Sequence, residues 1–162
     1  MKRIDEIHKK INRLGTEFTE KMNKLENLLL VQVHKNENGW TVIDILRHII
    51  VSEKVYIIFL KNAIDPSIKI PNKLNPSSYQ SVAEYNSSLQ NSSTSDTTNQ
   101  LREDFLKNQQ ALLKLLKSIR KVDLKVQVNH HLLNKNIDQF LDFMFWHSNH
   151  HLEQINGAIK NK

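Results

Sequence analysis

The chain has 162 residues, of which 39% are hydrophobic and 25% charged, so it can form one domain with a buried core. It has no cysteine, which excludes disulfides, thiolate metal ligands and a cysteine nucleophile. Eight histidines stand out, because few other side chains bind transition metals or titrate near neutral pH. The formal net charge of +6 raises the question of an anionic partner.

The basic residues are scattered from Lys2 to Lys162 and do not favour nucleic acid as a partner. The densest group lies where a helix is expected to end, and cations there offset the negative end of the helix dipole. This group consists of Lys114, Lys117, Arg120, Lys121 and Lys125. The charged start of the chain does not resemble a secretory signal, and the apolar run 55–60 is too short to cross a bilayer. We therefore expect a cytoplasmic protein with no membrane partner.

The first predicted helix spans about residues 2–29, where apolar side chains recur at steps of three and four. These are Ile4, Ile7, Ile11, Leu14, Phe18, Met22, Leu25 and Leu28. A turn at residues 36–39 follows. Thr41, with Asp44 three positions on, then has the spacing of a capping box and predicts a second helix from Val42 to about Ala63.

The second half of the chain begins with a proline-containing loop and a short accessory helix predicted over about residues 79–89. The polar stretch 86–100 reads as a loop, and a further helix is predicted from Ser95 or Asp96 to near Val122. Residues 125–133 alternate weakly and predict an extended or hairpin-like excursion. Asn136 and Gln139 then predict the start of a last helix over 137–160. One all-α domain over residues 1–162 follows, a four-helix bundle with an accessory helix in the central crossover.

Two histidines of the last predicted helix, His147 and His151, are four positions apart and therefore project from one face, one turn apart. The polar residues of this helix lie on the opposite side of the helical wheel. They are Asp138, Asp142, Asn149, Glu153 and Asn156. Both imidazoles are thus expected to point into the core, where an unpartnered polar group costs about 1–3 kcal/mol.

One divalent ion would satisfy both imidazoles at once, and a third inward-facing histidine, His48 on the second predicted helix, favours this reading. The alternative is that the imidazoles hydrogen-bond one another or a partner such as Tyr56. His150 lies off this face and reads as an exposed neighbour. No role is assigned to the remaining histidines, His8, His34, His130 and His131.

Two segments together resemble the DinB/YfiT superfamily. The first is Gly39-Trp40-Thr41 followed by a helix carrying Leu46-Arg47-His48, and the second is His147-x-x-His150-His151-x-x-Gln154-Ile155. The resemblance covers nearly the whole chain. It implies an up-down-down-up four-helix bundle that binds one divalent transition metal, nickel or zinc, through the matching positions His48, His147 and His151.

The resemblance also implies an activity, since related proteins are thiol-dependent S-transferases that use bacillithiol or mycothiol, or thiol-dependent isomerases. The expected function is a metal-dependent transferase that joins a low-molecular-weight thiol to a small-molecule electrophile. Because the chain has no cysteine, the sulfur has to come from a cosubstrate. The alternatives are a metal-dependent hydrolase, for which Glu53 is a poor base because it lies well around the helix from His48, and a non-catalytic binding bundle. A homodimer is expected, as in other members of the superfamily.

Overall fold

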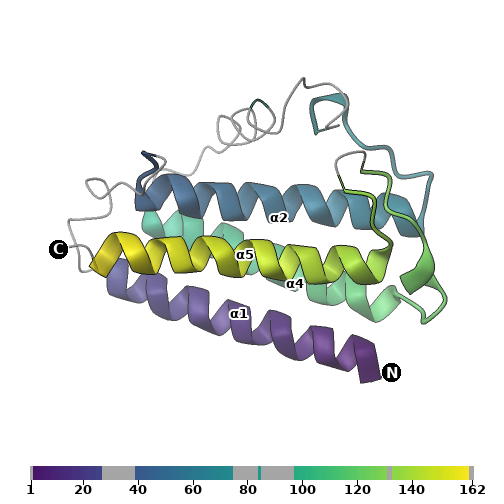
Figure 1. Ribbon diagram of the computed structural model, residues 1–162, viewed down its shortest axis with the longest axis horizontal. Coiled ribbons are helices and arrows are strands. Elements are labelled where there is room, and N and C mark those ends of the chain that lie inside the picture. Colours follow the sequence, from purple (N-terminus) through teal and green to yellow (C-terminus); the bar gives the residue numbers. More distant parts are fainter. Residues whose placement is uncertain (1, 27–38, 75–83, 85–96, 131–132, 161–162) are drawn as a thin grey trace.

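The computed structural model describes residues 2–26, 39–74, 84, 97–130 and 133–160 of the chain (Figure 1). Four long helices dominate this part: α1 (Lys2–Glu26), α2 (Val42–Ile64), α4 (Thr98–Ser118) and α5 (Ile137–Lys160). Two 3₁₀ turns, η2 (Asn72–Leu74) and η4 (Asp123–Lys125), lie in the connections. The predicted all-α class is confirmed, and the predicted accessory helix over 79–89 lies outside the described residues apart from Glu84.

The four long helices lie side by side in an up-down-down-up order (Figure 1). Helix α2 runs opposite to α1, α4 runs in the same direction as α2, and α5 returns in the direction of α1. Each helix packs against two others: α2 contacts α4 and α5, and α1 contacts the same two. The predicted four-helix bundle is therefore confirmed, with α2 and α5 as direct antiparallel neighbours.

The start of α2 is fixed by the capping box that the sequence predicts. Thr41 Oγ1 accepts a hydrogen bond from the Asp44 backbone N–H at 3.2 Å, and Asp44 accepts one from the Thr41 N–H at 2.9 Å. Gly39, two residues earlier, has φ of +78°, a left-handed conformation that favours glycine. The turn at Gly39 and this cap together set the place of Trp40 at the entry to the helix.

The start of α5 uses the same device. The Asn136 side chain accepts from the Gln139 N–H at 2.9 Å, and Gln139 Oε1 accepts from the Asn136 N–H at 3.2 Å. Just before it, the described residues 126–128 and 135–137 pair in the hairpin-like way that the sequence predicts for this excursion. The Val128 N–H donates to Lys135 O at 3.0 Å, and the Ile137 N–H donates to Val126 O at 2.9 Å.

Helix α4 is shorter at its C-terminal end than predicted. It ends at Ser118, not near Val122, because Ile119 has extended backbone angles of φ −75° and ψ 121°. The Asp123 carboxylate then accepts the Arg120 N–H at 2.7 Å and turns the chain into η4. At the other end the cap is Thr97, whose side chain accepts from the Gln100 N–H, and not Ser95 or Asp96. The last predicted residues of the first helix, 27–29, lie outside the described residues.

The bundle core consists of two apolar clusters that follow each other along the helices. One contains Leu14 to Leu25 of α1 with Val42 to Ile50 of α2, and includes stacked Phe18 and Phe105 with ring centroids 3.6 Å apart. The other contains Ile7 and Ile11 of α1 with Val51 to Leu60 of α2. None of the described helices is long and apolar enough to cross a membrane.

Candidate metal centre

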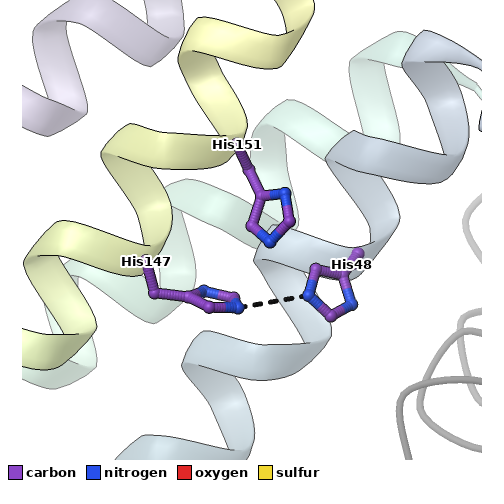
Figure 2. A group of neighbouring side chains, drawn as sticks. All are labelled: His48, His147 and His151. Atoms are coloured by element: carbon purple, nitrogen blue, oxygen red, sulfur yellow. Dashed lines mark hydrogen bonds between the residues drawn. The ribbon is translucent and has the colours of Figure 1, made fainter. Parts of the chain in front are cut away.

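Three histidines from two helices converge on one point between α2 and α5 (Figure 2). His48 is in the second turn of α2, and His147 and His151 are one turn apart on α5. Because α2 and α5 are direct neighbours, the imidazoles of both helices meet at their interface. The three residues that the sequence singles out are therefore brought together.

The nitrogen atoms of this cluster lie close to one another. One ligating nitrogen from each ring lies within 4.8 Å of the other two, and His48 Nε2 lies 3.2 Å from His147 Nε2 (Figure 2). Two nitrogens of a tetrahedral zinc site, each about 2.0–2.1 Å from the ion, are about 3.3 Å apart. The observed pair already has this spacing.

Burial keeps all three imidazoles in the neutral form that binds metals. His48 is 1% exposed, while His147 and His151 are half-buried. Burial, helped by the neighbouring His151, lowers the pKa of His48 to about 3 and that of His147 to about 2. Burial also lowers the pKa of His151, against the effect of its hydrogen bond with Gln154.

Gln154 orients the ring of His151. Its Oε1 atom lies 2.8 Å from His151 Nδ1, so this nitrogen donates its proton to the amide and leaves Nε2 as the lone-pair atom. The amide nitrogen of Gln154 lies 3.2 Å from His150 Nε2. His150 is exposed and stacks on Trp146, as expected of a residue off the triad face. It thus holds Gln154 without joining the cluster.

Aromatic rings surround the three histidines. Trp40 packs against His48 and His151, with ring centroids 5.1 and 6.3 Å away. On the other side, Tyr56 and Phe143 lie 5.5 and 5.8 Å from His147. Tyr56, the alternative hydrogen-bond partner considered from the sequence, presents its ring edge-on to His147. These ring contacts restrict the imidazoles to few orientations.

The residues present fit a divalent transition metal. Three neutral imidazoles are a donor set typical of zinc and nickel, and catalytic zinc sites use three protein ligands with one open position. Among the described residues, the contact between the Nε2 atoms of His48 and His147 is the one hydrogen bond of these two nitrogens, and an ion would replace it with two bonds to metal.

The other histidines stand apart from this cluster. His130 is 5% exposed and packs its ring against Phe59 and Phe140 in the core, 4.7 and 6.0 Å between centroids. His8 is half-buried on α1. His34 and His131 lie outside the described residues.

A second buried polar cluster was not predicted from the sequence. Glu53 is 2% exposed, and its carboxylate accepts hydrogen bonds from Ser148 Oγ at 3.0 Å and from Gln109 Nε2 at 3.1 and 3.2 Å. A signal was present: Gln109 stands four residues after Phe105 and three before Leu112, on the buried face of its helix. These hydrogen bonds join α2 to α4 through Gln109 and to α5 through Ser148.

Fold and site together define a four-helix bundle with a candidate three-histidine metal centre between its second and last long helices. The sequence matches the family model of the DinB superfamily over residues 13–155, so the chain belongs to the DinB superfamily. No curated protein and no solved structure gives a significant match to the chain.

Proposed function

We propose that the chain is a divalent-metal-dependent enzyme of the DinB superfamily, a transferase that joins an external low-molecular-weight thiol to a small electrophile. The observation that carries this proposal is the convergence of three neutral imidazoles within 4.8 Å at one helix interface. His48, His147 and His151 would hold the ion through one nitrogen each. When bound, the ion supplies a Lewis acid that lowers the pKa of a thiol and favours the nucleophilic thiolate.

The chain's own residues have three tasks in this proposal. His48 and His147 present neutral rings from facing helices, Gln154 fixes the tautomer of His151, and Trp40 covers two of the rings. The absence of cysteine supports an imported sulfur, because no side chain of the protein can form a thiolate.

Hydrolysis by the same centre is the competing chemistry. Metal-assisted hydrolysis would benefit from a carboxylate base beside the ion. Glu53, the buried acidic residue nearest in sequence to His48, is instead hydrogen-bonded to Gln109 and Ser148. This observation favours the transferase over the hydrolase.

The proposal is tested by activity of zinc-loaded and nickel-loaded protein, purified without a chelator or a His-tag. Bacillithiol and mycothiol are offered with a fluorogenic haloalkyl electrophile, beside ester and amide substrates without thiol. We expect metal-dependent and thiol-dependent turnover that His147→Ala abolishes and that His8→Ala, which removes a histidine of α1 apart from the cluster, largely retains. Turnover of an ester or amide without any thiol requirement would contradict the transferase.

A further inference from the structure

The end of the bundle near the start of α1 has a basic groove between α1 and α4. The groove has a volume of about 790 Å³, within the range of small-molecule sites. Basic residues from two distant segments of the sequence line it: Lys2, Arg3 and His8 on α1, and Lys117, Arg120 and Lys121 at and after the end of α4. Figure 1 shows that the start of α1 and the end of α4 lie at the same end of the bundle. No sequence pattern joins these two groups.

The charges in this groove are not balanced by the protein. Arg3 is paired with Asp138, and Arg120 is paired with Asp123. Lys2, Lys117 and Lys121 form no ion pair with any described residue. Asp5 is the acidic residue that lines the groove, and it too has no ion pair there. Arg3 also pairs with Glu6 and Asp142, so the imbalance concerns the unpaired lining groups alone, in which three lysines and one aspartate give a net charge of +2.

The floor of the groove is apolar. Leu116 is fully buried and Ile119 is 7% exposed, while Ile4 and Leu124 are half-buried at its sides. Leu116 itself has no exposed surface, so a ligand that fills the groove would contact the apolar carbon of Ile4, Leu124 and the edge of Ile119, and ammonium groups at the rim. A phosphate monoester carries a charge of about −1.5 to −2 at pH 7, which matches the two uncompensated charges, and lysine binds phosphate as a point charge.

We propose that this groove binds a dianionic small molecule, a phosphate monoester with an apolar organic part. The concave shape favours a single molecule over a flat lipid surface. The groove is separate from the three histidines of the metal centre. Arg3, which lines the groove, contacts Asp138 in the first turn of α5. His147 lies nine residues after Asp138, which is about 14 Å along the helix at 1.5 Å per residue. The proposal goes beyond the metal chemistry and does not depend on it.

The test is a titration of metal-free protein with phenyl phosphate, which has a dianionic phosphate and an apolar ring, followed by backbone amide chemical shifts. The protein is used without metal because phosphates also coordinate divalent ions. We expect saturable shifts confined to the first turns of α1 and the end of α4. The double variant Lys117→Gln/Lys121→Gln should weaken binding about tenfold or more, since two charge-assisted contacts are lost.

The matched control is Lys54→Gln/Lys61→Gln, which removes the same charge from exposed positions of α2 and should change the affinity by less than about twofold. Equal weakening by both double variants would show that net charge alone attracts the anion and would overturn the proposal. Absence of saturation at about 10 mM ligand would overturn it as well. A parallel arm uses phosphatidylglycerol vesicles, because Val122 beside the groove is 67% exposed. Binding to vesicles without binding to phenyl phosphate would replace the small molecule with a lipid surface.

Discussion

The buried carboxyl of Glu53 should make the stability of the bundle depend on pH near neutrality. It accepts hydrogen bonds from Gln109 and Ser148, and it forms no ion pair with any described residue. Burial raises the pKa of Glu53 from 4.5 to about 7, more than these two hydrogen bonds lower it. The folded protein therefore keeps a proton over a pH range in which the unfolded chain has lost it.

The sign and size of this effect follow from proton linkage. The folded-state pKa is raised, so the contribution of Glu53 is fully present below pH 4.5 and is lost as the pH rises through 7. At 1.36 kcal/mol per pKa unit, the rise from 4.5 to about 7 corresponds to about 3 kcal/mol of unfolding free energy. The lowered pKa values of His48 and His147 act in the opposite sense: their contribution is lost as the pH falls below 6.5.

The variant Glu53→Gln separates the two effects, because it removes the carboxyl and retains the histidines. The new amide still accepts from Ser148, and its NH₂ group can donate to Gln109 Oε1, which is buried without a partner. The free energy of unfolding is measured in urea for metal-free wild type and variant from pH 4 to pH 9. Relative to the variant, the wild type should lose about 3 kcal/mol of unfolding free energy between pH 4.5 and 7, and no more above pH 7. Parallel stability curves would refute the reasoning, and the exposed change Glu103→Gln should leave the curve of the wild type unaltered.

Gln154→Ala should weaken zinc affinity about tenfold, because His151 loses the acceptor that fixes its tautomer. Glu153→Ala, on the exposed face of the same helix, should leave the affinity unchanged. Competition with a chromophoric chelator measures the zinc affinity of both variants. Thr41→Ala should lower the unfolding free energy by about 1 kcal/mol through loss of the α2 cap, measured by urea unfolding beside the exposed change Thr16→Ala. Equal effects within either pair of variants would contradict the corresponding role.

Much of the fold could be predicted from the sequence, because the strongest local signals agree with the tertiary structure. The capping pairs Thr41–Asp44 and Asn136–Gln139 predict the starts of α2 and α5, and both are present as hydrogen bonds. The same periodicity places two histidines of α5 on one face. Their meeting with His48 depends on α2 and α5 being neighbours, which periodicity does not show; the inward-facing position of His48 and the resemblance to the superfamily together indicated it.

The features that sequence reasoning missed depend on contacts between distant segments. Glu53 hydrogen-bonds residues 56 and 95 positions away, so no local pattern shows that its carboxyl has partners. Lys117 and Lys121 look like cations that offset a helix dipole until α1 is placed beside them. The early end of α4 likewise depends on Asp123 accepting the Arg120 N–H, a turn that competes with the helix.

The central claim is that His48, His147 and His151 hold one divalent ion, and calorimetric titration of metal-free protein with zinc tests it most directly. We expect one ion per chain and a loss of affinity of about a hundredfold or more when any one of the three is changed to alanine. His8→Ala, which removes a histidine of α1 apart from the cluster, should bind zinc as the wild type does. Wild-type protein that takes up no stoichiometric zinc, or a His8 variant as defective as the His48 variant, would contradict the claim.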